Sequence, residues 1–151
     1  MEHPARSTRL QRIARMRAGD WAMTFEAIFW LIVARIGILV VPFRRLGWFY
    51  GRPLKDDPEP TWTADQVVLA TRVGNAVSRA ARFAPLPLVC LPQAMAARVM
   101  LRRRGITCLF YLGVARDGEA ALKAHAWTRT GAKIVTGGPQ HREFKPVATF
   151  L

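Results

Sequence analysis

The sequence is short of acidic residues. It has 10 Asp and Glu against 23 Lys and Arg in 151 residues, which gives a formal net charge of +13. A charge of this size points to an anionic partner: nucleic acid, an acidic membrane surface, or an acidic protein or peptide. Charge alone does not choose among these three. The length predicts one domain with an appendage, large enough to bury a real core.

Cysteine and histidine are also scarce. The two cysteines, Cys90 and Cys108, exclude a disulfide-rich framework, and the N-terminus carries no secretory signal. We therefore expect a reducing, cytoplasmic setting. A zinc site built from both cysteines with His125 and His141 would lack the close ligand spacing that is typical of zinc sites. We expect neither a metal nor a cofactor.

A long apolar run is missing as well. Residues 27–41 are apolar except for Arg35, and Pro42 closes the segment. A spanning helix needs about 20 apolar residues, and a central arginine is costly in lipid. We expect a helix that is buried against the domain or lies at the inner membrane surface. The aromatic and basic residues of 43–50 would suit a membrane interface or a partner peptide.

Proline and arginine content divides the chain. Residues 1–19 hold five arginines and one acid, which predicts a solvated or partner-binding arm. Residues 51–60 hold three prolines and are typical of a linker. We therefore expect an N-terminal basic and hydrophobic helical region with a Pro-rich linker over 1–60, and a second domain over 61–151 that carries both cysteines. Thr63 and Gln66 match a capping box, and the helix that they start should end before Pro85.

The central stretch is 87–105, which predicts a helix that opens at Cys90. Pro92 is tolerated in a first turn, and Gly105 sits where a left-handed residue ends a helix. The positive end of a helix favours a thiolate over a thiol. The alternative is a small buried core residue, because free cysteines are commonly buried.

Strand patterns follow this helix. Residues 107–114 predict a buried strand, and residues 124–130 alternate with His125, Trp127 and Arg129 on one face. A turn at Gly131 leads into a third strand over 133–135. The fold class is therefore α+β, with the cysteine-bearing helix packed on a small antiparallel sheet. Residues 144–150 should pack as a C-terminal extension.

Cysteine at a helix start with histidine on a strand 35 positions later is the order that papain-like and transglutaminase-like enzymes use. The helix end stabilises the thiolate, and an imidazole within hydrogen-bond reach takes its proton and returns it to the leaving amine. A third group holds the ring in the useful tautomer.

Several elements together resemble the lasso peptide biosynthesis B2 protein, a transglutaminase-like cysteine peptidase. They are Cys90-Leu91, Leu101-Arg102-Arg103-Arg104-Gly105-Ile106, Leu112-Gly113-Val114, Ala124-His125-Ala126-Trp127, and in the N-terminal part Ala34-Arg35 and Pro42-Phe43-Arg44-Arg45-Leu46. The resemblance implies a papain/transglutaminase-like fold. It implies that the protein removes the leader of a lasso peptide precursor, with Cys90 as nucleophile and His125 as base. Trp127 is expected to line the substrate cleft.

The resemblance also implies partners. They are the leader of the precursor peptide, a separate leader-binding recognition protein and a lasso cyclase, while no nucleic acid is expected. The charge of +13 would complement an acidic leader or partner. The alternative function is a non-catalytic basic binding module for anionic membrane, nucleic acid or an acidic partner. In that case Cys90 and His125 are structural.

One part of the family pattern is absent. The family has an aspartate about a dozen residues beyond the histidine, but no acid occurs between His125 and Glu143. A hairpin turn at Thr130 and Gly131 would place Thr136 opposite His125, and a three-residue loop would place Gly137 there. A hydroxyl or a backbone carbonyl then fills the orienting position. Three outcomes stay open: a weaker dyad, an acid from elsewhere (Asp65, Asp117 or Glu143), or an inactive homologue.

Overall fold

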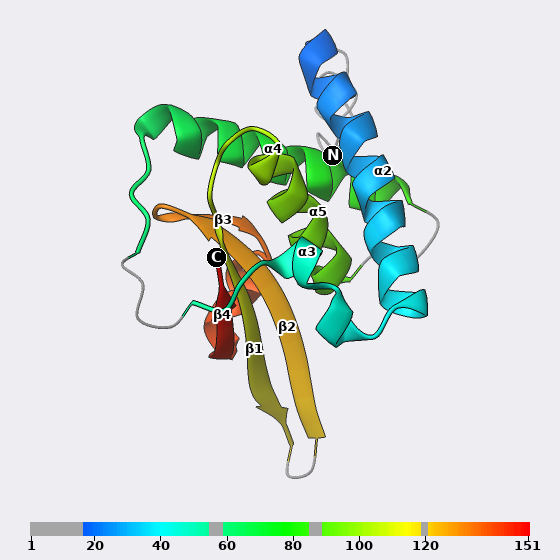
Figure 1. The fold of residues 1–151 in the computed structure, drawn as a ribbon, viewed down its shortest axis with the longest axis vertical. Helices are drawn as coiled ribbons and strands as arrows, with labels where there is room; N and C mark the ends of the chain where they lie inside the picture. The colour runs from blue at the N-terminus through cyan, green and yellow to red at the C-terminus, as the bar shows by residue number, and fades with distance from the viewer. Residues whose placement is uncertain (1–16, 55–58, 85–88, 119–120) are drawn as a thin grey trace, which may run out of the picture.

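The computed structural model describes residues 17–54, 59–84, 89–118 and 121–151. Its helical elements are α2 (Ala18–Val40), η1 (Phe43–Arg45), α3 (Gly47–Tyr50), α4 (Ala64–Phe83) and α5 (Cys90–Arg102). Its strands are β1 (Leu109–Asp117), β2 (Ala121–Thr130), β3 (Lys133–Thr136) and β4 (Lys145–Phe150), with the 3₁₀ turn η2 (Pro139–Glu143) before β4. The expected α+β order, helices before sheet, is confirmed (Figure 1). Most of the predicted N-terminal arm lies outside the described residues.

Local signals set two helix boundaries as predicted. The Thr63 hydroxyl accepts a hydrogen bond from the Gln66 backbone at 3.3 Å, and the Gln66 side chain accepts one from the Thr63 backbone at 3.0 Å. This capping box starts α4, which ends at Phe83. Helix α5 begins at Cys90, and Gly105 follows it with a φ of +68°. Residues at the ends of α4 and α5 therefore determine where these helices begin or end.

The capping box gives a stability prediction. Replacing Thr63 with Ala removes one half of it, and we expect the free energy of unfolding to fall by about 1 kcal/mol. Urea titration followed by circular dichroism measures this change. Thr61→Ala, two residues earlier at an exposed position, is the control and should leave the urea midpoint unchanged. Equal midpoints for the two variants would contradict the assignment.

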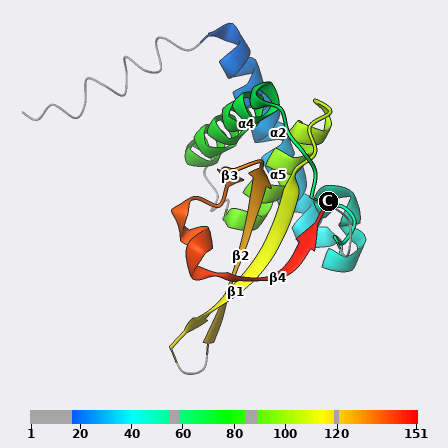
Figure 2. The same ribbon diagram turned by 90° about the vertical axis from the view of Figure 1, so that its left-hand side faces the viewer.

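The sheet has four strands in the order β3-β2-β1-β4, and every pair is antiparallel. Strand β4 was expected only as a packed extension. It instead pairs with β1, and Phe110 is opposite Phe150 in this pairing. The C-terminal residue then lies beside the segment that follows α3, where the Arg52 N–H donates a hydrogen bond to the Leu151 carbonyl oxygen (Figure 2). Pro146 fits because β4 is an edge strand.

The predicted hairpin register is wrong. The turn consists of Gly131 and Ala132 rather than Thr130 and Gly131, so Thr130 pairs with Lys133. Gly131 has a φ of +59° at the first loop position, where a type II′ turn needs glycine. A bulge after Thr128 then shifts the pairing again. As a result Thr136 faces Thr128 and not His125.

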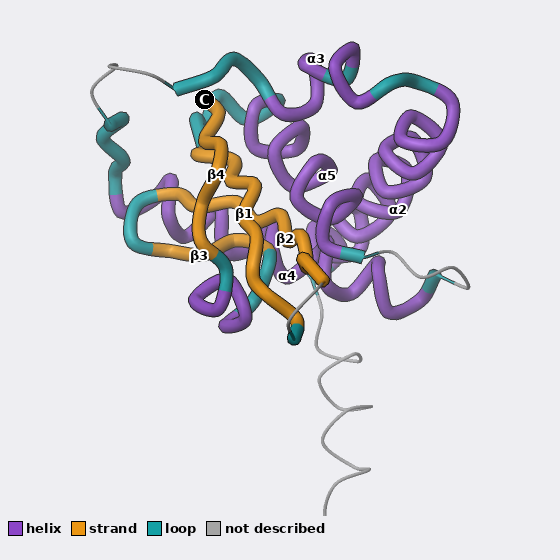
Figure 3. Tube along the Cα trace, turned by 90° about the horizontal axis from the view of Figure 1, so that it is seen from below, coloured by secondary structure: helices purple, strands orange, loops and turns teal. Residues whose placement is uncertain are grey.

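Helix α5 lies between the sheet and α2 and packs on both (Figure 3). One cluster joins α2, α4 and α5 through small and aliphatic side chains, among them Leu31, Val73 and Met100. A second joins α3 and α5 to the sheet and includes Met95, Phe110 and Ala126. Helix α2 is longer than the apolar segment suggested, with 23 residues. The N-terminal helices therefore share their core with the rest of the described chain.

Candidate active site

Cys90 is the first residue of α5 and is half-buried. Its side chain packs against the cluster that contains Ala94, Met95 and Ala126. No side chain caps the start of α5. The first backbone N–H groups of a helix have no partner within it, so this end offers donors and the positive end of the helix dipole beside the sulfur.

His125 lies on β2 in a ring stack. Its imidazole is 4.8 Å from the Phe144 ring and 5.9 Å from the Trp127 ring, and both contacts are close to parallel. Its Nε2 lies 2.9 Å from the Gly137 carbonyl oxygen. Because a carbonyl only accepts hydrogen bonds, Nε2 carries the proton and donates, and Nδ1 is the basic nitrogen of the neutral ring.

The orienting position is thus a backbone carbonyl. Gly137 supplies it from the residue directly after β3, with a φ of +100° that L side chains rarely adopt. The other position considered, Thr136, is turned elsewhere: its hydroxyl bonds the Thr128 hydroxyl at 2.9 Å. No carboxylate among the described side chains forms a hydrogen bond with His125. A carbonyl fixes the tautomer but does not offset imidazolium charge.

The two predicted catalytic side chains come from elements that pack on each other, α5 and β2. Successive residues of a strand point to opposite faces, and Ala126 is the one that packs with α5. His125 lies on the other face with Trp127 and Phe144, at the part of β2 that extends beyond its last pairing with β3. Within the described chain no hydrogen bond joins Cys90 to His125. Their catalytic roles stay predictions.

Trp127 lies beside His125 but is almost fully buried, with 3% of its surface exposed. Its ring stacks on Tyr111 at 5.2 Å, with 7° between the planes. Gly113 leaves room for it, because a Cβ there would lie 2.7 Å from the indole ring. Phe144, the closest ring to the imidazole, was predicted only as packing. The contact of Phe144 with His125 forms only in the folded chain, so the periodicity of the sequence does not predict it.

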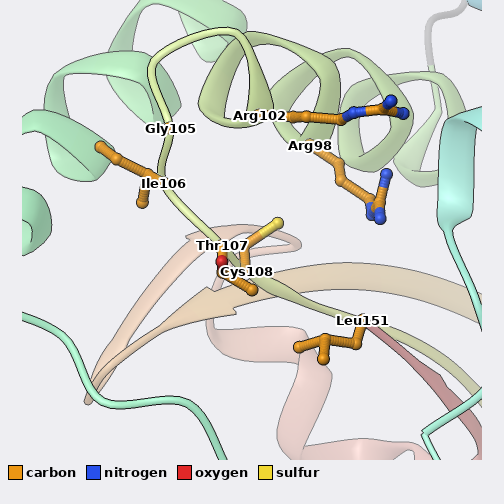
Figure 4. Close-up of a pocket in the computed structure, with 7 residues that line it drawn as sticks. All are labelled: Arg98, Arg102, Gly105, Ile106, Thr107, Cys108 and Leu151. Atoms are coloured by element: carbon orange, nitrogen blue, oxygen red, sulfur yellow. The ribbon is translucent and has the colours of Figure 1, made fainter.

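Cys108 lies in a separate place. It lines a cavity of about 390 Å³ with Arg98 and Arg102, between α5 and the neighbouring ends of the sheet (Figure 4). Burial raises the pKa of the Cys108 thiol to about 12, against a smaller opposite effect of Arg98. The thiol is therefore protonated at neutral pH, in agreement with its predicted role as inert packing.

This burial gives a reactivity prediction. In a Cys90→Ser chain at pH 8 we expect iodoacetamide to leave Cys108 unmodified, since the pH lies far below the pKa of its thiol and 3% of the residue is exposed. Intact-mass spectrometry measures the adduct. Adding urea to unfold the chain is the control and should release full labelling. Rapid labelling of the folded chain would contradict the burial.

No group of three or more possible metal-ligating His, Cys, Asp or Glu side chains occurs within residues 17–54, 59–84, 89–118 and 121–151. Cys90, Cys108, His125 and His141 lie in different surroundings: the start of α5, the Arg98 cavity, the Phe144 stack, and a hydrogen bond from His141 Nδ1 to Gly138 O at 2.6 Å.

Comparison with known proteins identifies a family. The family model described as the transglutaminase-like superfamily matches residues 35–149, from the last turns of α2 into β4. Both Cys90 and His125 fall inside the matched range. No curated protein and no solved structure matches the chain.

Proposed function

Because the chain belongs to the transglutaminase-like superfamily, which includes cysteine proteases, we propose that it is a cysteine peptidase that uses Cys90 and His125. The observation that carries this proposal is the state of the imidazole. The Gly137 carbonyl holds Nε2, so Nδ1 is free to act as base. The strand that bears this ring packs on the helix that opens with a half-buried, unpaired cysteine.

The proposed reaction is acyl transfer to the sulfur. Cys90 Sγ attacks the carbonyl carbon of the scissile peptide bond, and His125 takes the thiol proton and passes it to the leaving amine. Water then hydrolyses the thioester and restores the thiol. Backbone N–H groups at the uncapped start of α5 would hold the oxyanion. Because His125 lies on the face of β2 that Ala126 does not share, the mechanism requires the imidazole to move toward Cys90, and it predicts that Sγ and Nδ1 come within hydrogen-bond reach only in the substrate complex.

For the substrate we propose the leader–core bond of a lasso peptide precursor. What supports this is the set of sequence elements around Cys90, Gly105 and His125 that resemble the B2 leader peptidases. The net charge of +13 suits an acidic leader. We propose that a separate leader-binding protein presents the precursor and that a lasso cyclase takes the released core.

The test uses purified full-length protein and a lasso precursor peptide, with a leader-binding recognition protein present. We expect cleavage at one bond, seen by mass spectrometry as separate leader and core masses. A second peptide with the same core and a scrambled leader is the control and should stay intact. Cleavage of neither peptide would reject the leader-peptidase function, and cleavage of both equally would reject leader recognition.

A further inference from the structure

Helix α2 is apolar on the side that faces away from the protein. Its buried side consists of residues such as Ala27, Leu31 and Ala34, which pack toward α4 and α5. On the opposite side lies what we call the outer face, the six exposed apolar residues Phe25, Phe29, Ile32, Ile36, Leu39 and Val40, each between 52% and 70% exposed. A surface helix of a soluble domain normally carries polar residues there.

The outer face is a continuous stripe. From Phe25 to Leu39 its residues recur at intervals of three and four, which keeps them within one side of the helix, and Val40 follows at its end. At 1.5 Å per residue, the stripe from Phe25 to Val40 is about 22 Å long. Two further exposed aromatic side chains lie in the segment after the helix, Phe43 in η1 and Trp48 in α3, where Trp48 packs beside Trp30. The result is a ridge of large apolar side chains along the surface.

The charges around this ridge that are not already paired are basic. No acidic residue occurs between Glu26 and Asp56, whereas Arg35, Arg44 and Arg45 lie in that interval. The two carboxylates on α2 are each matched by arginine: Asp20 pairs with Arg72, and Glu26 pairs with Arg103 and Arg104. Hydrogen bonds from Arg72 and Arg104 lower the pKa values of Asp20 and Glu26. Arg44 and Arg45 are exposed at the end of α2, beside Phe43.

We propose that the outer face of α2, with Phe43 and Trp48, docks on the surface of an anionic lipid bilayer. Helices that lie in a membrane interface combine an apolar face with flanking basic residues, and tryptophan concentrates at the headgroup level. Anionic headgroups attract exposed arginines, each of which adds to binding. Helix α2 has the length and composition of a membrane span, but its inner side is occupied by α4 and α5, so the helix lies on the bilayer rather than across it.

Charge argues for lipid over a second copy of the chain. Two copies pairing through their outer faces would bring Arg44 and Arg45 of each near those of the other if the helices ran parallel, and near Arg17 at the start of the other α2 if they ran antiparallel. Like charges across an interface cost affinity in both arrangements. A bilayer with anionic lipid neutralises the same arginines. Of the most apolar 18-residue window of α2, 28% is buried inside the protein, so most of it is available to lipid.

The test is vesicle flotation of the full-length protein. We expect it to float with vesicles of equal phosphatidylglycerol and phosphatidylcholine and to bind pure phosphatidylcholine at least about tenfold more weakly. The variant Phe29→Ser/Ile36→Ser should lose at least about tenfold in partitioning to the anionic vesicles. The matched control is Val68→Ser/Leu122→Ser, which removes two equally exposed apolar side chains outside α2 and should bind like the wild type.

Two results would overturn the proposal. One is wild-type protein that stays in the soluble fraction with anionic vesicles. If that protein is also a dimer or a complex that Phe29→Ser/Ile36→Ser converts to monomer, the outer face binds protein and not lipid. The other is equal flotation of Phe29→Ser/Ile36→Ser and wild type. Circular dichroism melting confirms that each variant folds. The inference does not rest on the peptidase function, because Cys90→Ala should float unchanged.

Discussion

Replacing Cys90 with Ala is expected to abolish peptide cleavage, with a fall in kcat of at least about 10⁴-fold. The sulfur is the atom that forms the thioester. Cys108 cannot replace it, since only 3% of Cys108 is exposed and it faces the cavity that Arg98 and Arg102 line. Without the sulfur only positioning and the oxyanion donors would remain. The measurement is the rate of leader release, followed by mass spectrometry under single-turnover conditions.

The matched control is Cys108→Ala. It removes the other thiol, and we expect the rate to stay within about threefold of the wild type because Cys108 contributes only packing. Both variants are first compared by urea titration so that a loss of activity is not a loss of folding. Undiminished cleavage by Cys90→Ala would end the nucleophile assignment.

Replacing Gly137 with Ala should disrupt the candidate site at His125, whose imidazole the Gly137 carbonyl orients. The new Cβ would lie 2.3 Å from the Trp127 Cβ and 3.2 Å from the His125 Nε2, at a φ of +100° that strains any L residue. Strain and overpacking together should lower the free energy of unfolding by about 2–4 kcal/mol. The carbonyl that fixes the imidazole would move as well, so activity should fall in the protein that remains folded.

The neighbouring glycine gives the control for that experiment. Gly138 also has a positive φ, +56°, but a Cβ there meets nothing within 4 Å. Because its ψ of −165° places it in a region almost restricted to glycine, we expect Gly138→Ala to cost about 1–3 kcal/mol, from backbone strain alone, and to keep its activity. Urea midpoints and cleavage rates are measured for both variants. If Gly137→Ala behaves like Gly138→Ala, the close packing of Trp127, His125 and Gly137 is refuted.

Elements governed by local chemistry could be predicted from the sequence. The Thr63–Gln66 capping box and the start of α5 at Cys90 depend on residues a few positions apart, and both are confirmed. The alternation of β2 also places His125, Trp127 and Arg129 together, where Arg129 bonds the Tyr111 hydroxyl. Short-range periodicity contains enough information for these features.

Features that depend on distant pairing could not be predicted. Strand β4 contains Pro146, which weakens a strand pattern, and it exists because β1 offers it a free edge. The register of β3 depends on a turn type and a bulge, so the pairing of His125 with Thr136 was predicted wrongly. The sequence also did not predict that Phe29 and Ile36 are exposed, because an apolar helix has the same sequence pattern whether the rest of the protein covers all of its faces or only one.

The candidate site shows the same division. The sequence left a hydroxyl, a backbone carbonyl or an acid from elsewhere in the chain as the orienting group. In the structure the Gly137 carbonyl lies at His125 through a side-chain hydrogen bond rather than through strand register. The approach of Cys90 to His125 depends on how α5 lies over β2, which no spacing along the chain determines.

The most direct measurement of the central claim is therefore the coupling between these two side chains. Folded wild type and His125→Ala are treated with iodoacetamide at pH 7, and the rate of Cys90 labelling is followed by intact-mass spectrometry. The account predicts at least tenfold slower labelling in His125→Ala, because the imidazole no longer takes the thiol proton. Equal rates in the two proteins would show that the thiol and the ring act independently, which contradicts the account.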